Sequence, residues 1–446
     1  MGKYFGTDGF RGKAGKELCA SHAYRIGSIL AHSLAKNDKK PRIVIGKDTR
    51  ISSYMLEYAI ASGIASQGCD AYLMHVTTTP SVSYITRSDG FDFGIMVSAS
   101  HNPYYDNGIK IMNSLGEKID DVLIRKIEDY IDSNDTLPEK TDAKVGKIID
   151  YYEGRNRYIA SLISSCKTSL KGMKIGLDLS NGGAHMIAKS VFSALYGRVY
   201  VINDTPNGIN INENGGSTNT EALSRLVKEK GLDVGFAFDG DGDRAIAVDE
   251  NGNEINGDYL MYILALSLKE NNELSKNTVV TTIMSNLGLY KAFEREGISY
   301  KTVSVGDRYV SEEMSKYGYS LGGESSGHII ISKYATTGDG ILTAIKILEI
   351  MKEKNEPISA LCKSVKMMPQ LTRSIEVKNR EGVLNSAIVN DTYKEISEHL
   401  SDNGRIILRP SGTEPLIRIT VECESYEKCL LCVDKMEKAC IKGDTL

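Results

Sequence analysis

The most informative stretch of the chain is Phe93-Gly94-Ile95-Met96-Val97-Ser98-Ala99-Ser100-His101-Asn102-Pro103. Its first five residues form an apolar run that predicts a buried strand. Small polar residues follow, and Pro103 disfavours a helical conformation at Asn102, so the chain must turn there. Because ligands of α/β sheets bind at the carboxyl ends of strands, we expect a functional loop at 98–103. A serine in this loop is a nucleophile only if a partner activates it, and Lys110 on the next predicted strand is a candidate.

Strand-like runs alternate with helical patterns on both sides of this stretch. Such alternation predicts βαβ units with mixed, mostly parallel sheets. The order of predicted strands and helices is different in about the last 80 residues, and it suggests a smaller α+β domain there. The predicted strands are 42–45 (ending at Gly46), 71–74, 93–97, 174–178, 234–238 and 278–283, then 374–377, 405–408 and 416–422, with C-terminal helices at 392–400 and 426–439.

Length and composition limit the class of protein. A chain of 446 residues is too long for one hydrophobic core. The net charge of −4 argues against a nucleic-acid partner, and no apolar run approaches a membrane span. The N-terminus lacks the apolar region of a secretory signal, and the eight cysteines are scattered. We therefore expect a cytoplasmic protein with no nucleic-acid or membrane partner.

The acidic loop Asp239-Gly240-Asp241-Gly242-Asp243-Arg244 is a predicted metal site. Three carboxylates at alternate positions repel one another unless a cation lies among them, and hard oxygen donors suit Mg²⁺. An EF-hand loop is excluded because Arg244 occupies the position that requires glycine and the flanks alternate like strands. An acidic hairpin turn without a metal remains the alternative.

Two further loops have side chains suited to phosphate and to sugar. Arg409-Pro410-Ser411-Gly412-Thr413-Glu414-Pro415, with Arg418 on the next strand, offers hydroxyls, guanidinium groups and backbone N–H groups to an anion. Residues 322–328 include Glu324, Ser326 and His328, which suit a polyhydroxyl ligand. Near the N-terminus, Arg11 lies in a glycine-rich loop from which it could reach a phosphate.

In this order along one chain, the loops resemble the α-D-phosphohexomutase family over nearly the whole length. The resemblance rests on residues 6–12, 98–103 with 107–110, 239–244, 323–328 and 409–415. It implies four domains around a central cleft, each with one loop. We expect the phosphoserine loop in 1–145, the metal loop in 146–252, the sugar loop in 253–366 and the phosphate loop in a C-terminal domain at 367–446.

The resemblance also implies the role of each residue. Ser100 would carry a phosphate and share Mg²⁺ with Asp239, Asp241 and Asp243. The sugar phosphate would be bound by Glu324, Ser326, His328, Arg409, Ser411, Gly412, Thr413 and Arg418. The remaining catalytic candidates, Arg11, His101, Lys110 and Arg244, would surround the transferred phosphoryl group, with Lys110 as general acid/base.

The implied reaction interconverts glucosamine 6-phosphate and glucosamine 1-phosphate through a 1,6-bisphosphate, which also serves as activator. Ser325 departs from the family pattern, in which glucosamine members usually carry glutamine and glucose or mannose members methionine. A phosphoglucomutase or phosphomannomutase is therefore an alternative. A sugar-phosphate sensor without turnover and a Mg²⁺-dependent phosphatase are alternatives of other classes. The sequence is compatible with a homodimer but does not determine the oligomeric state.

Overall fold

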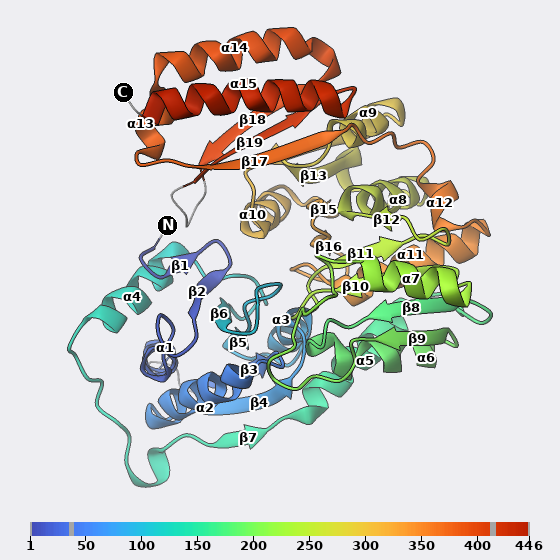
Figure 1. The fold of residues 1–446 in the computed structure, drawn as a ribbon. Helices are drawn as coiled ribbons and strands as arrows, with labels where there is room; N and C mark the ends of the chain where they lie inside the picture. Colours follow the sequence, from blue (N-terminus) through green and yellow to red (C-terminus); the bar gives the residue numbers. More distant parts are fainter. Residues whose placement is uncertain (1, 35–39, 411–415, 445–446) are drawn as a thin grey trace. The chain divides into compact units, whose positions relative to one another are not determined.

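The computed structural model describes residues 2–34, 40–410 and 416–444. In these residues the strands form four sheets (Figure 1). Three belong to α/β domains and the fourth to a smaller C-terminal domain, which confirms the predicted fold class. The contacts divide the chain into two compact units, Met1–Met284 with Ile298–Lys363, and Ser285–Gly297 with Ser364–Leu446.

The first sheet has the strand order β1-β2-β6-β5-β3-β4-β7. Strands β5, β3, β4 and β7 run parallel, whereas β1, β2 and β6 add antiparallel pairs at one edge. Alternate residues of β3 enter different cores: Ile43 and Ile45 pack with residues of α1 and α2, and Val44 packs with residues of α3. The elements are β1 (Phe5–Gly6), β2 (Gly9–Lys13), α1 (Ala20–Ser33), β3 (Arg42–Lys47), α2 (Ile51–Ser66), β4 (Asp70–Val76), α3 (Thr79–Ser88), β5 (Phe93–Val97), β6 (Asp106–Met112), α4 (Asp121–Asp132) and β7 (Ile148–Asp150).

Strand β3 corrects one detail of the sequence interpretation. It does not end at Gly46 but continues to Lys47, in parallel register with β5. A Cβ at Gly46 would lie 2.5 Å from a Val82 methyl carbon and 2.6 Å from a Thr77 methyl carbon. Glycine is therefore required here by the close approach of neighbouring side chains, and it does not mark the end of the strand.

The second sheet has the order β12-β11-β10-β8-β9 and supplies the acidic loop between β10 and β11. Every residue of β10 is buried, which explains its continuous apolar run. Helix α7 covers one face through Leu223 and Val227. The elements are α5 (Tyr152–Ser165), β8 (Lys174–Asp178), α6 (Ala188–Ala194), β9 (Arg198–Ile202), α7 (Glu221–Lys230), β10 (Val234–Phe238), β11 (Ala245–Val248) and β12 (Glu254–Ile255).

The third sheet, β14-β13-β15-β16, has parallel pairs between β14, β13 and β15, and an antiparallel β15–β16 pair. Residues 324–328 form the turn between β15 and β16. Val310 and Met314 of α10 pack against Val280 of β13. The elements are α8 (Gly257–Glu270), β13 (Thr278–Thr282), β14 (Ser299–Val303), α10 (Asp307–Tyr317), β15 (Leu321–Gly323), β16 (Ile329–Ile331), α11 (Gly340–Lys354) and α12 (Ile358–Leu361).

The second unit contains the antiparallel sheet β17-β19-β18. Helix α9 (Leu287–Arg295) follows β13 in the sequence but belongs to this unit. Buried Glu422 of the sheet helps to hold α9 in place. It accepts hydrogen bonds from the Leu287 N–H and from Arg405 Nε, both at 2.9 Å. The other elements are β17 (Gln370–Glu376), α13 (Arg380–Asn385), α14 (Ala387–Leu400), β18 (Arg405–Pro410), β19 (Leu416–Glu422) and α15 (Tyr426–Asp444).

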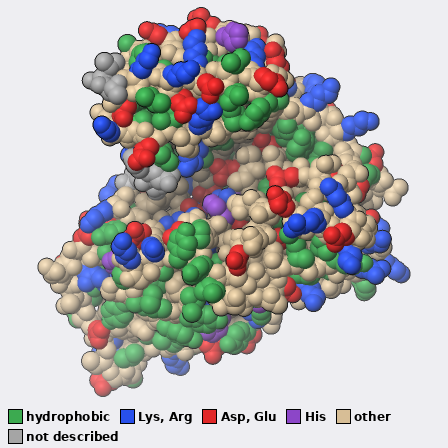
Figure 2. Space-filling view, viewed as in Figure 1, with side chains coloured by type: hydrophobic (Ala, Val, Ile, Leu, Met, Phe, Trp, Pro, Cys, Tyr) green, Lys and Arg blue, Asp and Glu red, His purple; other side chains and the backbone are tan. Residues whose placement is uncertain are grey.

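The surface carries both signs of charge. Figure 2 shows acidic and basic side chains interspersed over the face in view, and apolar side chains gathered over the part formed by the first sheet and its helices. Among the helices that the structure describes, none is both long and apolar enough to cross a membrane.

Candidate active site

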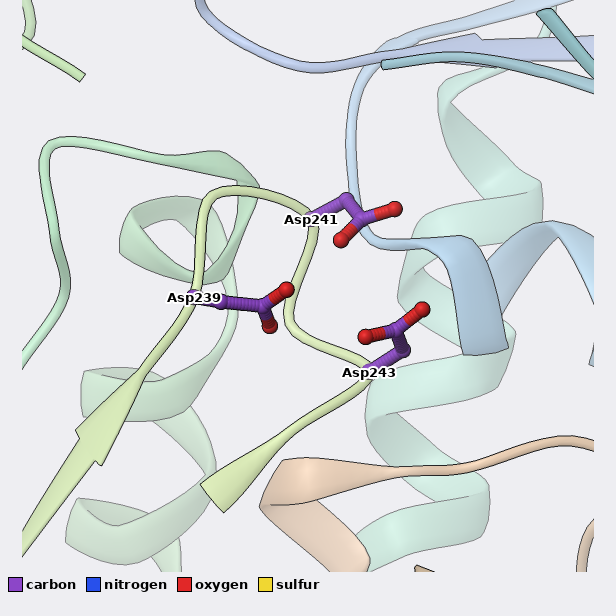
Figure 3. A group of neighbouring side chains, drawn as sticks. All are labelled: Asp239, Asp241 and Asp243. Carbon is purple, nitrogen blue, oxygen red and sulfur yellow. The ribbon is translucent and has the colours of Figure 1, made fainter. Parts of the chain in front are cut away.

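The carboxyl groups of Asp239, Asp241 and Asp243 point toward a common space (Figure 3). All three residues are buried, and one oxygen of each lies within 4.8 Å of the others. Asp241 Oδ1 and Asp243 Oδ1 are buried without a hydrogen-bond partner in the described part of the chain. A buried acceptor without a partner is unfavourable, and a divalent cation would supply one. The loop therefore fits a divalent metal, as the sequence predicted.

The protonation of these carboxyls reflects their crowding. Burial raises the pKa of Asp239 well above its ordinary value, and the neighbouring Asp243 and Asp241 raise it further. Burial also opposes ionisation of Asp241, but the Lys110 ammonium outweighs burial and lowers the pKa of that carboxyl. The site thus concentrates negative charge, and Lys110 compensates part of it.

Ser100 lies at the carboxyl end of β5, and its side chain meets the acidic loop. Its Oγ donates a hydrogen bond to Asp239 Oδ2 at 2.5 Å. The backbone of Ser100 has φ = 52°, a left-handed conformation that a non-glycine residue adopts only when its surroundings impose it. Its N–H donates to Ser98 Oγ at 2.9 Å, which helps to hold this conformation. The hydroxyl is therefore fixed beside the three carboxylates.

Two side chains outside the motif clamp the backbone of this loop. Fully buried Arg50 donates from Nη2 to the carbonyl oxygens of Ser100 and Asn102 at 3.0 and 2.6 Å. Asn212 donates from Nδ2 to the same two oxygens at 2.9 and 3.0 Å. Sequence reasoning did not assign either residue. The charged run 47–50 after a buried strand was a signal for Arg50, whereas Asn212 has no local signal.

Lys110 on β6 connects the acidic loop to the N-terminal loop. Its Nζ lies 2.8 Å from Asp241, 3.1 Å from Asp243 and 3.2 Å from Asp8. Burial lowers the pKa of Lys110, but the three carboxylates outweigh it and raise that pKa well above its ordinary value. Arg11 forms an ion pair with Asp8 and donates to Asn102 Oδ1 at 3.4 Å. The structure thus places Arg11 against the Ser100 loop and Lys110 against the acidic loop.

His101 and Arg244 complete the predicted catalytic group. His101 Nδ1 lies 3.4 Å from Ser100 Oγ. Burial, with Arg244 and Arg11, lowers the pKa of His101 to about 4, so the ring is neutral near pH 7. The Arg244 N–H donates to Asp239 Oδ1 at 3.1 Å, and its Nε lies 3.9 Å from Asp243 Oδ1. Cationic Arg11, Lys110 and Arg244 therefore lie close to the carboxylates that adjoin Ser100.

The predicted sugar-binding residues lie in the β15–β16 turn. Glu324 Oε1 accepts a hydrogen bond from the Gly306 N–H at 3.1 Å, and His328 Nε2 accepts one from the Gly338 N–H at 3.2 Å. Ser326 is half-buried. Beside this turn Asp307 pairs with Lys118, and sequence reasoning assigned neither. Their separation of 189 positions gave no signal in the sequence.

In the second unit, Arg409 of β18 lies directly opposite Arg418 of β19. Opposite residues of an antiparallel pair place their side chains on the same face of the sheet, so the two guanidinium groups share one face. The predicted binding residues Ser411, Gly412 and Thr413 lie outside the described residues.

Comparison with known proteins defines the class. Sequence profiles of the phosphoglucomutase/phosphomannomutase family match four segments: domain I over 2–138, domain II over 156–252, domain III over 256–368 and the C-terminal domain over 373–439. The chain belongs to this family of mutases, as the resemblance implied. A solved phosphoglucomutase/phosphomannomutase family protein from Burkholderia thailandensis has the same fold, with a TM-score of 0.82 at 22% identity, covering 98% of this chain and 97% of its own.

More similar relatives have a particular name. A protein from Lachnoclostridium phytofermentans named phosphoglucosamine mutase is 52% identical over 430 residues, which is 96% of each chain. A phosphoglucosamine mutase from Lachnospira eligens is 51% identical over 439 residues, or 98% of each chain.

We expect the acidic loop to bind a divalent cation in the isolated protein. Replacing Asp243 by asparagine removes one charged ligand and should weaken Mg²⁺ or Mn²⁺ binding at least tenfold, about 1.4 kcal/mol, in isothermal titration. Asp204→Asn, which changes a partly exposed aspartate outside the loop, is the control and should bind like the parent. Equal affinity in the two variants would contradict the assignment.

Proposed function

We propose that the protein is a phosphoglucosamine mutase, an isomerase that interconverts glucosamine 6-phosphate and glucosamine 1-phosphate. The observation that supports this best is the meeting of Ser100 with Asp239 beside Lys110, because it joins a nucleophile, a metal-binding loop and a proton carrier in one place. The names of the two relatives at 51–52% identity support the choice of sugar.

In the proposed reaction Ser100 carries a phosphoryl group in the resting enzyme. A hydroxyl of the sugar monophosphate attacks phosphorus, the new O–P bond forms as the Ser100 Oγ–P bond breaks, and the serine oxygen gains the proton that the hydroxyl loses. We propose Lys110 for the relay of that proton because of its position against the acidic loop. The resulting 1,6-bisphosphate then reverses its orientation in the site. Its other phosphoryl group is transferred to Ser100 by the reverse of these bond changes.

Positioning and charge neutralisation account for most of the acceleration in phosphoryl transfer. Arg11 and Arg244 are suited to bind the equatorial oxygens of the transferring group, since both are cations held beside the Ser100 loop. Mg²⁺, held by Asp239, Asp241, Asp243 and a phosphoserine oxygen, would neutralise further charge on that group. The clamp formed by Arg50 and Asn212 keeps the attacked phosphorus in one position during both transfers.

Other groups are proposed to recognise the rest of the substrate. Glu324, Ser326 and His328 would bind sugar hydroxyls, and the loop between β18 and β19 would bind the phosphate that does not react. That loop must accept either end of the sugar, so it should recognise phosphate and little else. We further propose Mg²⁺ as the metal, a sugar 1,6-bisphosphate as activator, and the cytoplasm as the location, with the enzyme working as a monomer or a homodimer.

Loss of the serine hydroxyl should abolish the covalent route. Ser100→Ala should lower kcat by several orders of magnitude while the protein stays folded, because the phosphoryl group has no resting position. Intact-mass measurement should show a phosphorylated fraction in the parent that is missing from the variant. Ser98→Ala is unsuitable as a control because Ser98 supports the loop, so Ser88→Ala on α3 is used instead. Turnover close to the parent's in Ser100→Ala would contradict the phosphoserine role.

Arg409→Ala should raise KM for the monophosphates. Loss of one charge-assisted hydrogen bond to phosphate costs about 1.5–3 kcal/mol, and the bisphosphate should be released more often during turnover. Arg373→Ala changes an arginine of the same sheet that pairs with Asp434 and Glu437, and it serves as the matched control. An unchanged KM in Arg409→Ala would show that this arginine does not bind the phosphate.

The choice of sugar is tested by the ratio of kcat/KM for glucosamine and glucose phosphates on one preparation. A protonated 2-amino group favours a site rich in carboxylates, so the ratio should exceed one, with measurable activity on glucose phosphate because Ser325 is short. A ratio at or below one would assign the enzyme to the phosphoglucomutase alternative and leave the phosphoserine mechanism intact. Steady release of inorganic phosphate would instead favour a phosphatase.

A further inference from the structure

A half-buried lysine–aspartate pair, Lys118 with Asp307, adjoins the proposed sugar-binding turn and has no role in the mechanism above. Asp307 is the first residue of α10, and its side chain is 13% exposed. Both of its carboxylate oxygens accept hydrogen bonds from Lys118 Nζ, at 2.7 and 2.6 Å. His328 Nε2 lies 3.7 Å from Asp307 Oδ2, and the preceding Gly306 N–H donates to Glu324. Asp307 is therefore next to two residues that we propose to bind the sugar.

The same pair is connected to the proposed proton carrier. Lys118 Nζ lies 3.0 Å from Asp8 Oδ1, and the other oxygen of Asp8 is 3.2 Å from Lys110 Nζ. One cavity of about 310 Å³ is lined by Asp8, Lys110, Lys118, Asp243, Asp307 and His328, among others. This volume is at the lower end of the range for small-molecule sites. The Lys118–Asp307 pair, the proposed proton carrier Lys110 and the sugar-binding candidate His328 thus line the same cavity.

The geometry leaves Asp307 able to bind a second cation. An ionised carboxylate has about four acceptor positions. Lys118 occupies two of them and the Arg308 N–H, 2.8 Å from Oδ1, a third, which leaves one position available. Burial by itself would raise the pKa of Asp307, but Lys118 outweighs burial and lowers that pKa, so the group is ionised. A carboxylate held ionised in a mostly buried site attracts an ammonium much more strongly than a neutral hydroxyl.

We propose that Asp307, held by Lys118, is a specificity-determining residue that receives the 2-ammonium group of the amino sugar. This inference rests on the proposed function. It adds a second carboxylate to Glu324, whose Oε1 already accepts a backbone hydrogen bond. In the glucose phosphates a hydroxyl replaces the ammonium, and the contact with Asp307 loses its charge–charge part.

A purely structural role is the competing explanation. Lys118 belongs to the segment after β6, and Asp307 to α10, so the pair could serve only to hold these parts together. Arg308 already makes a second ion pair there, with Asp121 at 2.7 Å. A structural role would lower activity toward both sugars by the same factor, whereas a specificity role changes the ratio between them.

The test measures kcat/KM for glucosamine 6-phosphate and glucose 6-phosphate with phosphorylated enzyme. Asp307→Asn keeps the shape but removes the charge, and the ratio should fall roughly 10- to 100-fold, as expected for one lost charge-assisted hydrogen bond. Lys118→Met removes the ammonium that keeps Asp307 ionised, so it should lower the ratio in the same direction. Glu349→Gln is the matched control, because Glu349 forms a comparable buried pair with Lys346 at 2.7 Å away from this cavity.

An unchanged ratio in Asp307→Asn would overturn the inference while leaving the proposed function intact. A parental ratio at or below one would reject the proposed substrate, and the inference with it. Thermal unfolding of each variant reports whether it is folded. If Asp307→Asn does not fold, Asp307→Ser takes its place, because the smaller side chain leaves room for water to solvate Lys118, and the same fall in ratio is expected.

Discussion

The repulsion between the buried carboxylates of the β10–β11 loop is the constraint on which the site depends. Asp239, Asp241 and Asp243 lie too close together to be ionised at once without nearby cations. Their surroundings meet this need with Lys110, whose Nζ lies 2.8 Å from Asp241, and with Arg244. A divalent cation would complete the compensation. The Ser100 hydroxyl is placed against this cluster, so the same charges that require compensation also adjoin the group proposed to carry phosphate.

The Ser100 loop shows how the scaffold supports this arrangement. The backbone of Ser100, at φ = 52°, is in an unfavourable conformation for a residue other than glycine. Arg50 is the residue that precedes α2, Asn212 lies in the segment after β9, and both donate to the same two carbonyl oxygens. The hydrogen bonds from these two side chains, which lie in segments of the first and the second α/β domain, offset the free-energy cost of the strained backbone. A loop backbone held by several hydrogen bonds suits a site in which the phosphoryl group on Ser100 must react with the substrate in two orientations.

A series of ion pairs with alternating charges connects the metal loop, through the N-terminal loop, with α10. Asp243 contacts Lys110, Lys110 contacts Asp8, Asp8 contacts Lys118, and Lys118 contacts Asp307. Each ion in this series is mostly buried and has an opposite charge beside it, which is the condition for tolerating buried charge. The series physically connects the residues proposed for proton transfer with those proposed for sugar recognition.

The sequence by itself determined the fold class and the motifs. The bounds of β5 and β10 agree with their apolar runs, because a strand buried on both faces must be apolar throughout. The loops around Ser100 and 239–244 were identifiable since glycine, proline and carboxylate patterns are local. Only the tertiary structure decided which partners they meet: Arg50, Asn212, Lys118 and Asp307 act across separations of 50 to 189 positions. Such contacts depend on packing between sheets, and no periodicity along the chain encodes them.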